Sequence, residues 1–152
     1  MSTIAFALVS LFLAVMRLRM GHGFPDFLAA WLVVISFYGE GTKGILQVAW
    51  IGLMHGFPSQ PQIEAVLAVA LFLVFRSQRF HLGRDGWLPR TIGVALACLV
   101  LCLPELVVMD MAEWRSHAKL LATYGLVSGT LSWPLFAIGR RWGAPMGLRP
   151  AT

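Results

Sequence analysis

The sequence predicts an all-α fold, a polytopic membrane bundle of about five transmembrane helices with its N-terminus outside and its C-terminus in the cytoplasm. Hydrophobic residues make up 58% of the 152 residues, and charged residues only 12%. The apolar residues gather in five stretches, and about 20 apolar residues in a helix cross a bilayer. Arginine and lysine concentrate at alternate boundaries of these stretches, as the positive-inside rule requires.

The predicted spans are residues 3–16, 27–54, 63–75, 92–109 and 120–138. The first and third are short for a full crossing. We expect them to tilt or to recruit the arginines that follow them, Arg17 and Arg76, whose long side chains can reach back to water. The number of spans therefore lies between four and six.

The second stretch is interrupted by GEGTKG at residues 39–44, so it forms either one long, kinked span or a re-entrant hairpin. With one span, nine arginines lie inside and two basic residues outside, setting Lys43 aside. With a hairpin, every later loop changes sides, which leaves four basic residues inside and seven outside. The positive-inside rule therefore predicts a single long span.

Polar side chains within this second span are the candidate lining of a water-filled pathway. Glu40, Lys43 and Gln47 are spaced by three and four residues and share one helix face. Intramembrane charges cost at least about 2.5 to 3.5 kcal/mol on insertion scales and usually face protein or water. The alternatives are a compensated ion pair at a kink or a polar loop at the membrane surface.

The fourth span contains the hinge candidate Pro104, because proline removes a backbone donor and kinks a helix. After this span, Asp110, Glu113 and His117 follow at a spacing that suits a divalent metal. A solvated helix at the membrane surface explains them equally well, and no second cluster completes a coordination sphere. We therefore predict no metal site.

The fifth span carries small residues at a spacing that allows close helix contact. Gly125 and Gly129 are four apart, and Ser128 and Ser132 lie beside them. Such a face packs against another helix, either of a second copy or of the same chain. The tryptophans near span ends are predicted to be interface anchors: Trp87, Trp114, Trp133 and Trp142.

Several function classes are disfavoured by the sequence. The formal net charge of +5 follows from the predicted cytoplasmic loops and favours anionic lipid, not nucleic acid, as a partner. Cys98 and Cys102 are predicted to be buried thiols within a span. The chain contains no recognisable triad, phosphate loop or haem-attachment motif. We predict no enzymatic activity and no cofactor.

The first half resembles the three-transmembrane holins of tailed phages. The resemblance rests on LFLAVMRLR at residues 11–19, LAAWLVV at 28–34 and EAVLAVAL at 64–71 leading to Arg76. It divides the chain into a holin-like region, residues 1–79, and a further two-span region with a short basic tail, residues 80–152. The second span is longer than in the family, and the last two spans have no counterpart there.

The resemblance implies a homo-oligomer in the bacterial inner membrane that permeabilises the bilayer and so releases or activates an endolysin during host cell lysis. A holin needs no catalytic residue, only helices that exchange lipid contacts for protein contacts and a polar face that lines water. Two alternatives stay open: a small transporter or channel subunit, and an accessory subunit of a larger membrane complex.

Overall fold

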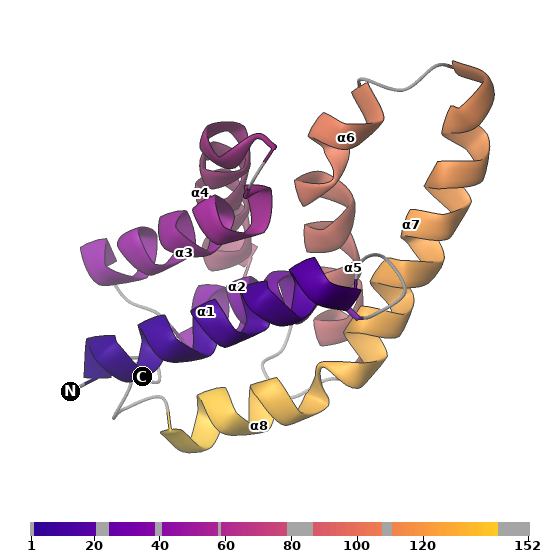
Figure 1. Ribbon diagram of the computed structural model, residues 1–152. Coiled ribbons are helices and arrows are strands. Elements are labelled where there is room, and N and C mark those ends of the chain that lie inside the picture. Colours follow the sequence, from indigo (N-terminus) through magenta and orange to yellow (C-terminus); the bar gives the residue numbers. More distant parts are fainter. Residues whose placement is uncertain are drawn as a thin grey trace.

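A computed structural model describes residues 2–20, 25–38, 41–57, 59–78, 87–107 and 111–142. All regular structure in these residues is helical (Figure 1), which confirms the predicted all-α class for this part of the chain. The helices are α1 (Ser2–Met20), α2 (Phe27–Tyr38), α3 (Gly41–Gly56), α4 (Pro61–Gln78), α5 (Trp87–Leu101), α6 (Leu103–Val107), α7 (Met111–Leu131) and α8 (Trp133–Trp142).

Helix α2 is the central element of the bundle. It is apolar on all sides, and every residue from Leu28 to Tyr38 is buried, as expected for a helix that has no polar face to turn to water. It contacts α1, α3, α4, α5, α7 and α8. One core cluster therefore joins both halves of the sequence, with Trp31 and Phe72 from the first and Val94 and Phe136 from the second.

The single long span predicted for residues 27–54 is wrong. These residues form α2 and α3, and Gly41 opens α3 with a φ of +56°, a left-handed conformation that glycine adopts without strain. Asp26 precedes α2 and His55 lies in the last turn of α3, yet their Oδ2 and Nε2 atoms are 2.7 Å apart. The chain therefore turns back on itself between the two helices.

This turn also separates basic residues that the positive-inside rule had placed on one side. Arg17 donates to the carbonyl of His55, and His55 contacts Glu64 in the first turn of α4. Arg76 stands in the last turn of α4, about 18 Å further along by helical rise. The two arginines thus lie toward opposite ends of the bundle, because a hairpin reverses every element that follows it.

Glycines set the closest helix contacts. A Cβ at Gly52 of α3 would lie 2.5 Å from the Ala65 Cα of α4, and one at Gly129 of α7 would lie 2.6 Å from the Thr91 carbonyl oxygen of α5. Side chains at these positions would force the helices apart. The antiparallel pairs α3–α4 and α5–α7 therefore depend on glycine.

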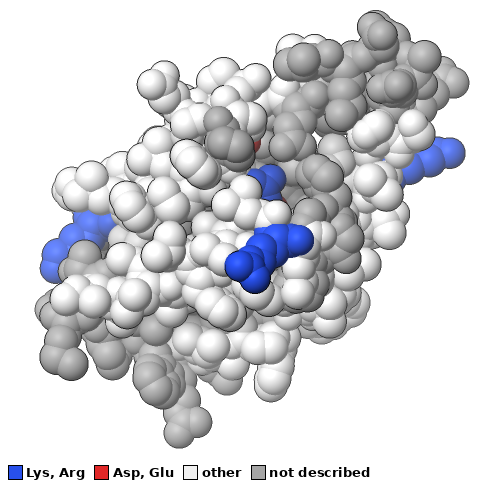
Figure 2. Space-filling model, viewed as in Figure 1, with Lys and Arg blue, Asp and Glu red and all other residues white. Residues whose placement is uncertain are grey.

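Within the described residues, no single helix is both long and apolar enough to cross a membrane. Ser116–Leu131 and Trp133–Gly139 meet the requirement only as a pair, with a bend of 47° between them. Large apolar side chains nevertheless cover much of the outside, such as Phe12, Val66 and Leu120, which are 62%, 69% and 54% exposed. Figure 2 shows one face, on which uncharged residues predominate and the basic residues stand apart.

Candidate functional site: a buried charged quartet

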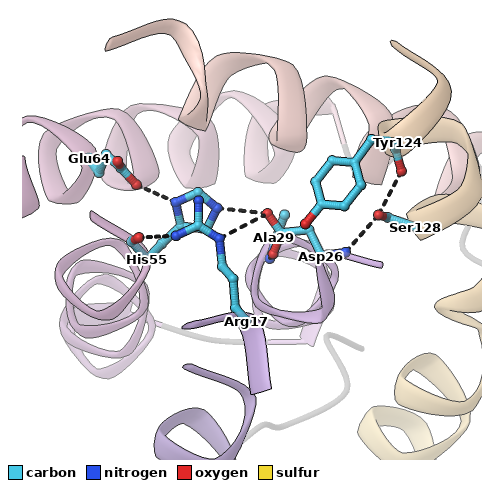
Figure 3. A network of polar contacts seen from close by, with 7 residues as sticks. All are labelled: Arg17, Asp26, Ala29, His55, Glu64, Tyr124 and Ser128. Carbon is cyan, nitrogen blue, oxygen red and sulfur yellow. Dashed lines mark hydrogen bonds and ion pairs between the residues drawn. The ribbon is translucent and has the colours of Figure 1, made fainter. Parts of the chain in front are cut away.

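Four ionisable side chains from four structural elements meet inside the bundle: Arg17, Asp26, His55 and Glu64, called here the charged quartet (Figure 3). Each stands at or beside a helix end. Arg17 lies in the last turn of α1, Asp26 precedes α2, His55 lies in the last turn of α3 and Glu64 in the first turn of α4. The up-and-down course of these helices brings the four ends together.

Asp26 is placed by its role as the N-cap of α2. Its Oδ1 accepts a hydrogen bond from the Ala29 backbone N–H at 3.0 Å, which satisfies one of the free donors at the helix start. Its Oδ2 is left to face His55 Nε2 at 2.7 Å. A single carboxylate therefore both begins the central helix and anchors the imidazole.

His55 bridges two carboxylates. Its Nε2 contacts Asp26 and its Nδ1 contacts Glu64 Oε2, and all three side chains are no more than 1% exposed. A carboxylate accepts hydrogen bonds, so an imidazole with a carboxylate at each ring nitrogen donates from both. The geometry therefore favours the imidazolium form of His55.

Arg17 completes the charge balance. Its Nη1 donates to the His55 carbonyl oxygen, and its Nε lies 4.0 Å from Asp26 Oδ2, with the side chain only 16% exposed. Two cations and two carboxylates give the quartet no net charge. Such balance is what permits charges to be buried, since an unpaired ion in the interior is strongly unfavourable.

The electrostatics of the quartet oppose the effect of burial. Asp26 lies before the start of α2, and His55 lies in the last turn of α3. Burial alone would raise the pKa of Asp26, but the positive charges of His55 and Arg17 outweigh it and hold that pKa below its ordinary value. Burial alone would lower the pKa of His55, but Asp26 and Glu64 raise it above its ordinary value.

The second half of the chain is tied to the quartet through α7. The Ser128 hydroxyl accepts a hydrogen bond from the Asp26 backbone N–H at 2.7 Å and donates to the Tyr124 carbonyl oxygen at 2.7 Å. The Tyr124 ring extends toward Asp26 (Figure 3). Ser128 thus uses its donor and an acceptor site, and it links α7 to the start of the central helix.

The arrangement suits a fixed network of ion pairs that holds the helix ends together, called here the clasp, better than it suits a proton relay. A relay from Asp26 through His55 to Glu64 requires an imidazole that is neutral for part of the cycle. Here two carboxylates hold His55 protonated, and Arg17 adds a positive charge beside Asp26. The described cavities are lined by other residues.

Comparisons with known proteins add no assignment. No family model, curated protein or solved structure matches the chain. The functional assignment therefore rests on the quartet and on the outer surface.

The residues proposed to line a pathway do not converge on the quartet. Glu40 lies outside the described residues. Lys43 is exposed in the first turn of α3, and Gln47 is half-buried, with an Oε1 atom that is buried without a hydrogen-bond partner. The described part of the chain therefore shows a polar atom in the interior at Gln47, but no continuous polar stripe.

The packing candidates on α7 face α5 of the same chain. A Cβ at Gly125 would lie 3.1 Å from the Ala95 Cα, and Gly129 meets Thr91 as described above. Ser132 donates to the Gly129 carbonyl oxygen at 2.6 Å. Of the two arrangements that the sequence allowed, the described contacts are those of packing within one chain.

Pro104 occupies the first turn of α6, directly after the break that ends α5 at Leu101. In the sequence cluster considered for a metal, Asp110 and the side chain of Glu113 lie outside what the structure describes, and His117 is half-buried. Among the described residues, no group of three or more His, Cys, Asp and Glu side chains is arranged to hold a metal ion.

Sequence reasoning missed the quartet as a unit. Of its four members, only Arg17 has a stated expectation, which is that its side chain reaches back to water and not into the bundle. One signal was available: Arg17, Asp26 and His55 directly flank predicted apolar stretches, and Glu64 is the second residue of another. With residues 27–54 folded as a hairpin, these four residues come to lie at the same end of the bundle.

Proposed function

We propose that this chain is a non-catalytic accessory subunit that resides in the bacterial inner membrane as a multi-pass protein and holds a larger membrane complex together. The observation that carries the proposal is the charged quartet. It fastens α1, the start of α2, the end of α3 and the start of α4 to one another, with its charges balanced inside the chain. A subunit of this kind needs a fixed shape, which such a clasp supplies.

The outer surface supports membrane residence. On α1, large apolar side chains are exposed on the face opposite the buried Phe6 and Leu13, among them Leu8 and Phe12. Extended apolar surface of this kind marks a membrane or protein contact. Lipid and partner helices are both apolar, so the same surface serves a subunit that contacts each of them.

The position of the quartet supports this proposal over a transporter. Substrate and coupling-ion sites of transporters lie near the bilayer midplane, at the ends of broken helices. The quartet instead gathers at the ends of helices α1, α3 and α4, where the chain passes from one helix to the next. That place suits a fastening of the bundle better than a pathway through it.

A holin-like lesion is the second candidate, favoured by one observation. The Gln47 Oε1 atom is buried without a partner, and Lys43 stands one turn before it on the same helix. A rearrangement that exposed this face to water would satisfy the amide and line an opening. In that case the chain acts as a homo-oligomer upstream of an endolysin.

Inducible expression in a bacterium with a potential-sensitive dye separates the two candidates. An accessory subunit inserts in the membrane, leaves the potential unchanged, and migrates on a native gel in a species that contains other chains. A holin depolarises the cell abruptly, and Lys43→Ala combined with Gln47→Leu retimes that event. Abrupt depolarisation by the unaltered chain would overturn the accessory proposal in favour of the holin.

A further inference from the structure

Helix α3 carries a straight line of exposed side chains along one face. Lys43, Trp50 and Phe57 follow one another at intervals of seven residues, and Leu46 lies between the first two. All four are exposed, Leu46 by 66%, Trp50 by 40% and Phe57 by 57%. Residues three, four or seven apart share one face of a helix. The four side chains therefore form a single line, called here the Lys43 seam.

The opposite face of α3 is engaged within the chain. A Cβ at Gly52 would lie 2.5 Å from the Ala65 Cα, and one at Gly56 would lie 2.7 Å from the Pro61 Cα, so α3 packs directly on α4 there. Val48 is fully buried on the same side. The Lys43 seam is thus the face that the packing of α3 in the bundle leaves open.

Lys43 is a cation without a counter-charge in the described part of the chain. It forms no ion pair with any residue that the structure describes, and α3 contains no acidic residue. Lys43 also stands in the first turn of α3, where the helix dipole is positive and favours an anion. The seam therefore presents uncompensated positive charge at one end and apolar surface along the rest.

The spacing of the seam favours a helix as its occupant. Apolar residues that recur every seven residues, with others between them, are the pattern by which two helices pack along their length, and a single lysine in such a line fixes the register of the pair. Within a membrane, a charged side chain usually faces protein and pairs with one of opposite charge. A lipid phosphate can also pair with a lysine, but it makes no use of an ordered line of apolar side chains.

We infer that the Lys43 seam binds an apolar helix of a partner subunit, with a carboxylate of that helix facing Lys43. The partner helix lies along about 21 Å of α3, from Lys43 to Phe57, with aliphatic side chains against Leu46 and Trp50. The inference rests on the proposed role as an accessory subunit, and it names the surface and the chemistry of the contact. The charged quartet does not supply this contact, because its charges are balanced within the chain.

Synthetic transmembrane helices test this inference with the full chain in vesicles of neutral phosphatidylcholine. The probes are peptides of leucine and alanine that differ in one residue near one end, glutamate or glutamine, and energy transfer from a dye on the chain to a dye on the peptide measures association. We expect the glutamate peptide to bind at a mole fraction about tenfold lower than the glutamine peptide, the size of a polar contact between model membrane helices. A peptide with glutamate at its centre is the register control and should bind like the glutamine peptide.

Variants of the chain assign the preference to the seam. Lys43→Gln should abolish it, and Lys43→Glu should reverse it in favour of a peptide with lysine at the same position. Trp50→Ala should weaken the binding of both peptides and leave their ratio unchanged. Arg19→Gln removes an exposed arginine of α1 and should leave the preference intact. Equal binding of the glutamate and glutamine peptides, or equal effects of the glutamine variants at Lys43 and Arg19, would overturn the inference. So would loss of the preference when phosphatidylglycerol is added, since lipid phosphate would then be the occupant at Lys43.

A native gel of membranes from expressing cells separates this inference from the accessory role itself. Lys43→Glu should release the chain from the larger species that the unaltered chain forms. If the chain with this substitution stays in that species, the inference is overturned and the accessory role stands. If the unaltered chain forms no such species, the accessory role itself fails.

Discussion

Removing one charge from the quartet should destabilise the fold far more than removing two of opposite sign. Asp26→Asn keeps the size of the side chain and the acceptor for the Ala29 N–H, but it leaves two cations facing Glu64 alone. The ion pair with Arg17 spans 4.0 Å, for which Coulomb attraction is about 4 kcal/mol at an effective dielectric constant of about 20. Breaking a buried pair typically costs about 3 to 5 kcal/mol, so the two estimates agree.

The measurement is the free energy of unfolding in mixed micelles, followed by circular dichroism as a denaturing detergent is added. Arg17→Gln combined with Asp26→Asn restores neutrality and should cost clearly less than the sum of the two single changes. Lys43→Gln, which removes an exposed lysine of α3, is the control and should change stability by less than about 0.5 kcal/mol. A loss below about 1 kcal/mol for Asp26→Asn, or simple additivity in the double variant, would refute the clasp.

Three further predictions concern the pH dependence of stability, the contact between α3 and α4, and the hydrogen bond of Ser128. The quartet raises the pKa of His55 and lowers that of Asp26, so the free energy of unfolding should be greatest between about pH 4 and 6.5. It should decline above that range, where the His55 imidazole of the unfolded chain loses its proton, and below it, where the Asp26 carboxylate of the unfolded chain gains one. A flat unfolding profile from pH 5 to 9 would count against this. Gly52→Ala should lower the melting temperature, because the added Cβ would lie 2.5 Å from the backbone of α4 and overpacking costs about 1 to 3 kcal/mol. Gly93→Ala is the control and should not lower it, since its Cβ would lie 3.4 Å from the nearest side chain. Ser128→Ala should lower the free energy of unfolding by about 1 to 3 kcal/mol, because it leaves the buried Asp26 N–H without its acceptor. Thr123→Ala removes an exposed hydroxyl of the same helix and should leave the free energy of unfolding nearly unchanged.

Some of these features were readable from the sequence because they depend on local pattern. The uniformly apolar run of α2 specifies a helix with no face for water, and it is the buried centre of the bundle. Gly125 and Gly129 mark a face for close helix contact, although spacing alone does not name the neighbouring helix, which is α5. Pro104, expected to kink the fourth span, falls in the first turn of α6, directly after the break that ends α5.

The sequence by itself determined the helical class, the apolar character of the surface and the glycine positions at which helices can come close, because each depends on neighbours within a few residues. Only the tertiary structure decided that residues 27–54 fold back on themselves. The positive-inside rule compares basic residues in the loops and takes no account of a turn such as the one at Gly41. That reversal in turn brings Asp26 to His55 across 29 positions of the chain. The quartet depends on which helix ends meet in space, and neither spacing nor composition encodes that.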